Sequence, residues 1–270
     1  MARPISFLSD FGFDDEFVGV VHGVLRRIAP GVEIVDVAHG IERGDVRGGA
    51  LALLRAVQYL PPGVVLAVVD PGVGTARRAI AAETEWGDFV GPDNGLLAPA
   101  VAMLGGASRF VAVESEQFRL PQRGGTFDGR DVFAPAAAVL ASGEASLGDL
   151  GPDVPPESVT PLLLPLVEHE GIEVRGEVWW IDTYGNAQTN ISPDDMTLAG
   201  MRAGEAVSLR VGAVTHDLMW AAAYGAGESP LVLEDSHGLM AVSVPRGRAD
   251  EVLGLREGLP VVFSPPSAIG

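Results

Sequence analysis

Short apolar runs alternate with helix-like patterns through the first half of the chain. Runs rich in valine, isoleucine and leucine predict strands at Ile5–Ser9, Glu33–Ala38 and Val64–Val69. Between them, apolar residues recur at the spacing of one helix face over Asp15–Ile28 and Asp45–Leu60. This βαβαβ alternation is typical of a largely parallel sheet covered by helices, and it predicts a three-layer α/β domain.

The pattern changes after Gly171, where strand-like runs are separated by turns and the helical candidates are short. Strands are predicted at Glu173–Ile181, Ala206–Val211, Pro230–Leu233, Leu239–Val244 and Leu259–Phe263. Such a series is typical of a small antiparallel β domain, and we expect a barrel.

The segment between the two patterns is rich in proline. Residues Gly151–Leu166 contain five prolines and little periodicity, which is typical of a linker between domains. We therefore expect an α/β N-terminal domain over residues 1–150, a proline-rich linker over 151–171 and a β-barrel C-terminal domain over 172–270.

Charge and composition limit the classes of binding partner that this chain can have. The 270 residues are 47% hydrophobic and carry a net charge of −18 without a basic stretch, which argues against nucleic acids and anionic membrane surfaces as partners. No apolar run approaches the roughly 20 residues that span a bilayer, and Met1 leads directly into a predicted strand rather than a signal peptide. A cytoplasmic location is expected.

Two residue types are missing. There is no cysteine, and all 18 basic residues are arginine, so lysine is absent too. This excludes a Schiff base, a phosphate-loop lysine, a thiolate nucleophile and a cysteine-bound zinc ion. The five histidines, at positions 22, 39, 169, 216 and 237, have no close metal-ligand spacing, so no histidine-rich metal site is predicted.

The most informative motif is the end of the third predicted strand. There an apolar run ends on Asp70, and the glycine-rich turn that follows carries Arg77. In open α/β sheets ligands bind outside the carboxyl ends of the strands, so both side chains are predicted to share one pocket. The turn lacks the third glycine and the following helix of a dinucleotide site, because Ala79–Glu83 is predicted to be another strand. An NAD site is therefore not expected.

Other aspartates occupy equivalent places. Asp10 follows the first predicted strand and Asp182 follows the first strand of the second domain, each beside a turn signature. For each aspartate taken alone, the alternative to ligand binding is a structural role as a cap or in an Asx turn. Their shared position at strand ends favours ligand binding.

Seven ordered motifs, spread over nearly the whole chain, resemble those of the S-adenosylmethionine (SAM) hydroxide adenosyltransferases, relatives of the fluorinases and chlorinases. The motifs are Ser9-Asp-Phe-Gly-x-x-Asp15, Asp36-Val-Ala-His39, Asp70-Pro-Gly-Val-Gly-Thr75, Gly91-Pro-Asp-Asn-Gly-Leu96, Thr126-Phe-x-Gly-Arg-Asp131, Ile181-Asp-x-x-Gly-Asn-x-x-Thr-Asn190 and Ser236-x-Gly238.

The resemblance implies attack of water on the C5′–S bond of SAM, giving adenosine and methionine without a metal or an organic cofactor. Asp70 and Arg77 match the water-activating group. A halogenase would lack the Asp70 carboxylate, so its presence favours water over halide. Water is a weak nucleophile, with a pKa of about 15.7 when no metal is bound, and it needs such assistance.

For the adenosine end of the substrate, the resemblance implies that Asp10 binds the ribose hydroxyls, for which an acceptor with two oxygens is suited. Tyr184 and Asn186 match positions that contact adenosine, and Phe127 matches one beside the sugar. Core packing is the alternative for the two aromatic residues.

For the methionine end, the resemblance implies that Asp182 pairs with the ammonium group and that Ser236 lies at the carboxylate. It also implies a homotrimer, with each active site formed between the N-terminal domain of one subunit and the C-terminal domain of the next.

One position departs from the family pattern. Where the motif Thr-Phe-His-Gly-Arg-Asp has histidine, this chain has Asp128. Two aspartates around one arginine form a coupled pair in which repulsion raises one pKa, so one carboxylate can serve as a base. Alternatively, the second negative charge repels hydroxide and leaves a protein that binds SAM or adenosine with little turnover. A halide-using adenosyl transferase is the other alternative.

Overall fold

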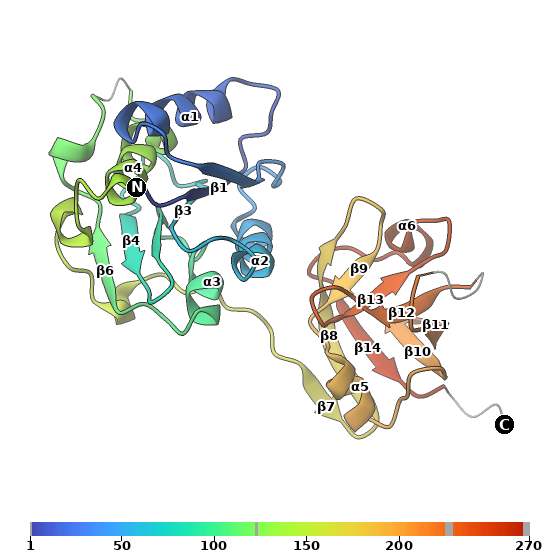
Figure 1. Ribbon diagram of the computed structural model, residues 1–270. Helices are drawn as coiled ribbons and strands as arrows, with labels where there is room; N and C mark the ends of the chain where they lie inside the picture. Colours follow the sequence, from blue (N-terminus) through green and yellow to red (C-terminus); the bar gives the residue numbers. More distant parts are fainter. Residues whose placement is uncertain (1, 122–123, 225–228, 267–270) are drawn as a thin grey trace. The chain divides into compact units, whose positions relative to one another are not determined.

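The computed structural model describes residues 2–121, 124–224 and 229–266. The chain forms two compact units, Met1–Leu162 and Leu163–Gly270 (Figure 1). Their boundary lies within the predicted linker. The first part of that segment packs on the first unit, where Asp153 forms a β-bridge with Val111 and the backbone N–H of Thr160 donates to Asp93.

A six-stranded sheet forms the centre of the first unit, in the order β2-β1-β3-β5-β4-β6. The pairs β1–β2, β1–β3 and β3–β5 are parallel, whereas β4 is antiparallel to β5 and β6. The strands are β1 (Ile5–Ser9), β2 (Ile34–Ala38), β3 (Val64–Val68), β4 (Ala79–Glu83), β5 (Asp88–Pro92) and β6 (Arg109–Ala112).

Helices cover both faces of this sheet, as expected for a three-layer α/β fold (Figure 1). Because successive strand residues point to opposite faces, Leu66 and Val68 of β3 pack with α1 and α4, whereas Val65 and Ala67 pack with α2 and α3. The helices are α1 (Phe17–Ile28), α2 (Val46–Val57), α3 (Ala98–Met103) and α4 (Ala134–Ser142), with short helical turns η1 (Glu116–Phe118), η2 (Gly129–Phe133), η3 (Leu147–Leu150) and η4 (Pro156–Ser158).

The second unit is a closed β-barrel. Its strands follow the order β14-β10-β11-β12-β13-β9-β8, the pairing of β14 with β8 closes the barrel, and β7 pairs with β8. All these pairs are antiparallel except β11–β12, which is parallel. The elements are β7 (Glu168–Glu170), β8 (Glu173–Ile181), β9 (Ala187–Thr189), α5 (Pro193–Leu198), β10 (Ala206–Val211), β11 (Val214–Trp220), β12 (Leu231–Glu234), β13 (Met240–Ser243), α6 (Ala249–Leu253) and β14 (Pro260–Ser264).

These two folds confirm the predicted classes, an α/β unit followed by a β-barrel. The pattern failed to predict some elements, among them β5, β6 and β11. β5 reads Asp-Phe-Val-Gly-Pro, and its glycine and proline are turn signals, so neighbouring strands rather than local preference make it a strand.

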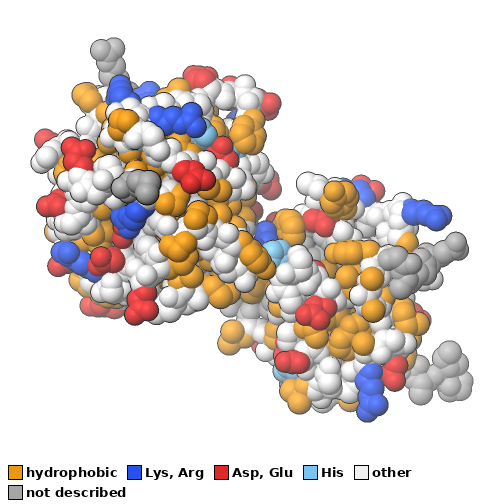
Figure 2. All heavy atoms as spheres, viewed as in Figure 1, with side chains coloured by type: hydrophobic (Ala, Val, Ile, Leu, Met, Phe, Trp, Pro, Cys, Tyr) orange, Lys and Arg blue, Asp and Glu red, His pale blue; other side chains and the backbone are white. Residues whose placement is uncertain are grey.

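The surface agrees with the acidic composition. On the face drawn in Figure 2, acidic side chains are scattered over both units rather than gathered in one patch. Within the described part of the chain, the helices are too short or too polar to pass through a bilayer.

The core of the first unit provides a stability test. Leu66 is fully buried in the central strand β3. We expect Leu66→Ala to lower the free energy of unfolding by about 2–5 kcal/mol, because it leaves a cavity between β3, α1 and α4. Leu163→Ala, at a largely exposed leucine, is the control and should change it by less than about 0.5 kcal/mol. Urea unfolding followed by circular dichroism measures both, and equal effects would contradict the packing described here.

Candidate functional site

The turn after β3 brings Asp70 and Arg77 together. The backbone N–H of Val73 donates to the carbonyl of Asp70 at 3.2 Å, and the hydroxyl of Thr75 donates to the carbonyl of Gly72 at 2.7 Å. These bonds fold the chain back on itself directly after the buried strand. Arg77, at the end of the turn, is therefore brought next to the carboxylate of Asp70, which precedes the turn.

Arg77 binds two carboxylates at once. Its Nε donates to Asp70 Oδ1 at 3.0 Å and its Nη2 also bonds to Asp70 Oδ2, which makes a bidentate pair. The same Nη2 donates to Asp128 Oδ2 at 2.8 Å. The exposed fraction of the side chain is 9% for Arg77, 6% for Asp70 and 16% for Asp128, so all three are mostly buried. The structure thus joins the three predicted catalytic residues, whose roles remain predictions.

The environment raises the pKa of Asp70 above the ordinary aspartate value. Burial is the main cause and the negative charge of Asp128 adds to it, whereas Arg77 and the backbone N–H of Gly72 act in the opposite direction. One guanidinium cannot neutralise two carboxylates. Asp70 therefore has a greater affinity for a proton than an exposed aspartate has, which suits a general base.

A cavity of about 570 Å³ opens beside this cluster. Arg77 and Asp128 line it, together with the hydroxyl-bearing Thr75 and Thr126. Arg77 also lies over the ring of Phe133, with its guanidinium carbon 5.2 Å from the ring centre. The cluster therefore has an apolar support on one side and polar space on another.

Asp10 lies at the same sheet edge as Asp70, because β1 and β3 are adjacent and parallel. Its backbone N–H donates to the carbonyl of Val68 at 3.3 Å, and its Oδ2 accepts the backbone N–H of Gly44 at 2.8 Å. These bonds hold the carboxylate in place at the end of its strand.

Phe127 belongs to an aromatic cluster at the start of η2. Its ring meets Phe11 at 5.7 Å and Phe17 at 5.1 Å between centres, edge to face. The guanidinium of Arg130 lies 5.1 Å from its centre, and Arg130 also forms a bidentate pair with Asp131. Phe127 is thus packed on one side, as the core-packing alternative expects.

In the second unit, Asp182 organises the turn between β8 and β9. Its Oδ1 accepts the backbone N–H groups of Tyr184 and Asn186, both at 2.9 Å, and its Oδ2 accepts the Asn186 side-chain amide at 2.8 Å. This is the Asx turn weighed from the sequence. Tyr184 lies in this turn and is 78% exposed, so the core-packing alternative is wrong for this residue. Ser236 lies exposed in the turn after β12.

Sequence reasoning missed two residues beside this turn. Arg248 Nη1 donates to the carbonyl of Thr183 at 3.0 Å, and its Cβ lies where a side chain on Gly185 would have to go. Burial, followed by the negative charges of Asp182 and Asp235, raises the pKa of Tyr224. The Asp-x-x-Gly spacing gave no signal for either residue, because both come from distant parts of the chain.

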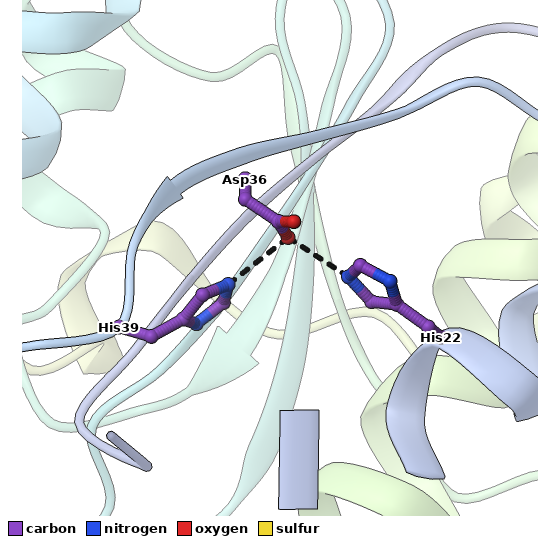
Figure 3. Close-up of side chains that lie close together, drawn as sticks. All are labelled: His22, Asp36 and His39. Carbon is purple, nitrogen blue, oxygen red and sulfur yellow. Dashed lines mark hydrogen bonds and ion pairs between the residues drawn. The ribbon is translucent and has the colours of Figure 1, made fainter. Parts of the chain in front are cut away.

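The structure also brings together two histidines that are distant from each other along the chain. His22 of α1 and His39, after β2, both point at Asp36 of β2 (Figure 3). His39 is fully buried, and burial lowers its pKa against the opposing pull of Asp36. Its ring is therefore neutral at pH 7. The prediction of no histidine-rich metal site rested on spacing along the chain and overlooked this group, because strand pairing and helix packing bring the residues together.

Both units match one family. Residues 5–151 match the SAM hydroxide adenosyltransferase N-terminal domain, and residues 176–262 match the corresponding C-terminal domain.

Individual proteins agree with this match. The chain is 45% identical to an (R)-S-adenosyl-L-methionine hydrolase of Thermus thermophilus, over 96% of this chain and 98% of that protein. It is 28% identical to a fluorinase of an Actinoplanes species, over 96% and 97% of the two chains. The crystal structure of an uncharacterised conserved protein from Thermotoga maritima superposes with a TM-score of 0.90 at 35% identity, over 96% and 99% of the two chains.

Matches to both domain types and similarity along almost the full length agree with the seven motifs found in the sequence. This chain belongs to the SAM hydroxide adenosyltransferase family.

Proposed function

We propose that this protein hydrolyses S-adenosyl-L-methionine to adenosine and L-methionine. The buried pair of Asp70 and Arg77 carries the proposal, in a chain 45% identical to a protein named as such a hydrolase. That name specifies the (R) compound, and we propose the same substrate here.

The reaction is a displacement at carbon. The oxygen of water bonds to C5′ of the ribose while the C5′–S bond breaks, and the electron pair of that bond stays on sulfur as the thioether of methionine. The water loses one proton, so SAM and water yield adenosine, methionine and H⁺. Because the hydroxide-like oxygen loses its negative character on bonding to C5′ while the sulfonium loses its positive charge, opposite charges cancel during the step, and a pocket that excludes bulk water favours it.

Asp70 is the proposed base. Its carboxylate accepts the proton of the attacking water, and its raised pKa favours that transfer. Arg77 presents only hydrogen-bond donors, so it does not act as the base. Its role is to orient the Asp70 carboxylate through two hydrogen bonds and to offset part of the negative charge. Asp128 adjusts the proton affinity of Asp70.

The substrate contacts are proposals from the family pattern. Asp10 would bind the ribose hydroxyls, Phe127 would pack against the sugar, and Tyr184 and Asn186 would contact the adenosine. The exposed ring of Tyr184 supports this assignment, because an exposed aromatic side chain is available to stack on a base.

At the methionine end, Asp182 would pair with the ammonium group and Ser236 with the carboxylate. We also propose the homotrimer that the family pattern implies, in which the N-terminal unit of one subunit completes its site with the C-terminal unit of the next. The predicted substrate residues fall in both units, which supports it. A cytoplasmic location stays a prediction.

A halide-using transferase is the competing reaction, and the fluorinase similarity gives it a specific basis. Fluoride and chloride need no base. The Asp70 carboxylate in the cluster repels an anionic nucleophile, whereas it assists a neutral water molecule. The cluster therefore favours hydrolysis.

The products decide between these reactions. Purified protein is incubated with (R)-SAM, with the sulfonium epimer as control, in the presence and absence of fluoride or chloride, and the products are separated by chromatography. We expect adenosine and methionine in equal amounts, independent of halide. A 5′-halo-5′-deoxyadenosine would establish the halide reaction, and SAM binding without product at high enzyme concentration would establish a binding protein.

Replacing the proposed base tests its role. Asp70→Asn keeps the shape of the side chain but removes its proton acceptor, so we expect kcat to fall by at least about 100-fold while SAM binding measured by calorimetry persists. The control is Asp153→Asn, which alters an exposed aspartate paired with Arg109 and should retain parental activity. Activity of Asp70→Asn above a tenth of the parent would contradict the assignment.

The pH profile tests the coupling of the two carboxylates. Hydrolysis requires ionised Asp70, so activity falls as pH drops through its pKa, and the midpoint of this acid limb should lie above 3.8, the ordinary aspartate value. Asp128→Asn removes a negative charge that raises this pKa, so the limb should move to lower pH. The profile of kcat/KM measures both. A limb that stays in place or moves upward would refute the coupling.

A further inference from the structure

His22, Asp36 and His39 form a compact group that the proposed reaction does not use. Asp36 Oδ1 lies 2.8 Å from His22 Nε2 and 3.0 Å from His39 Nε2 (Figure 3). One possible ligand atom from each of the three residues lies within 4.8 Å of the other two. Two imidazole nitrogens and a carboxylate oxygen therefore lie close together, with both nitrogens directed at the same oxygen.

These donors suit a divalent transition metal ion. Imidazole and carboxylate together bind zinc, iron, cobalt and nickel, whereas magnesium and calcium prefer oxygen ligands alone. Around a tetrahedral zinc ion with bonds of about 2.0–2.1 Å, ligand atoms lie about 3.3 Å apart. To reach that spacing, the distances from Asp36 Oδ1 to His22 Nε2 and to His39 Nε2 would need to lengthen by only a few tenths of an ångström.

The surroundings of His39 prepare it to act as a ligand. Its Nδ1 lies 2.7 Å from the hydroxyl of Ser9, so a hydrogen bond on that side fixes the ring and directs Nε2 towards Asp36. The ring also packs against Phe7 and Phe13, at 4.5 and 5.2 Å between centres. A polar second-shell partner and an apolar shell around a fixed histidine are regular features of metal sites.

The group is open to solvent on its other side. His39 has no exposed side-chain surface, whereas His22 is 20% and Asp36 is 40% exposed. An ion can therefore enter from solvent, with water completing its coordination beside three protein ligands. Because the chain has a net charge of −18, cations are enriched near its surface.

We propose that His22, Asp36 and His39 bind one zinc-like divalent transition metal ion, which ties α1 to the end of β2. The ion stabilises the structure and takes no part in hydrolysis, since none of its ligands is among the residues assigned to the substrate. His39 is hydrogen-bonded to Ser9, which directly precedes Asp10, so the ion also steadies the end of β1.

Metal binding by protein without an affinity tag tests the proposal. After treatment with a chelator, the protein is titrated with ZnCl₂ by calorimetry and with CoCl₂ by visible absorption, with MgCl₂ as the oxygen-preferring comparison. We expect one saturable Zn²⁺ or Co²⁺ site per chain, a tetrahedral cobalt spectrum, a higher melting temperature with Zn²⁺ and no comparable response to Mg²⁺.

Two ligand variants and a matched control make the test specific. Loss of a second-shell partner costs roughly 10–100-fold in affinity, so loss of a ligand in His22→Gln or Asp36→Asn should weaken binding by about 100-fold or more. His169→Gln is the control, because His169 contacts Asp195 at 2.9 Å in a similar histidine–aspartate pair, and it should bind zinc like the parent.

Circular dichroism establishes whether each variant is folded, and the two ligand variants alter different elements, α1 and β2. Absence of a saturable site in the parent, or equal zinc affinity in the parent and a folded ligand variant, would overturn the proposal. The group would then be a hydrogen-bonded brace only. The outcome is independent of SAM hydrolysis, because the measurement is metal binding.

Discussion

The arrangement around the candidate site depends on one guanidinium that binds two carboxylates away from bulk water. Arg77 makes a bidentate pair with Asp70 and a further bond to Asp128, with all three side chains mostly buried. One positive charge leaves the group with a negative excess where solvent screening is weak. Burial, and in addition the negative charge of Asp128, raises the pKa of Asp70, so the constraint that organises the site also suits Asp70 to the proposed role of base.

The sheet satisfies this constraint by placing strand ends side by side. The parallel strands β1 and β3 deliver Asp10 and Asp70 to one edge, and the glycine-containing turn after β3 returns Arg77 to that edge. Asp128 comes from a distant segment at the start of η2. The packing of α1 and α4 on one face and of α2 and α3 on the other fixes the position of each strand end at the edge of the sheet. The core therefore determines the geometry of the polar group.

The residue types in the chain limit how this polar chemistry can be arranged. Without lysine or cysteine, every positive side chain near the candidate site is an arginine or a histidine, and the proton-transfer groups are carboxylates and imidazoles. Arginine pairs with carboxylates in fixed bidentate geometry, as in Arg77–Asp70, Arg130–Asp131 and Arg248–Asp250. Histidine and aspartate form the other recurrent pair, seen at Asp36 and Asp195.

The sequence by itself determined the fold classes, several strands to the residue, such as Ile5–Ser9 and Glu173–Ile181, and the family, because periodicity and ordered motifs are properties of contiguous residues. It also predicted that Asp70 and Arg77 come together, since a short turn joins them, and the two side chains are paired. Only the tertiary structure decided that β5 is a strand, that Asp128 reaches Arg77, and that His22 and His39 share Asp36. Those contacts join segments distant in sequence, and strand pairing and core packing bring them together, which no local pattern encodes.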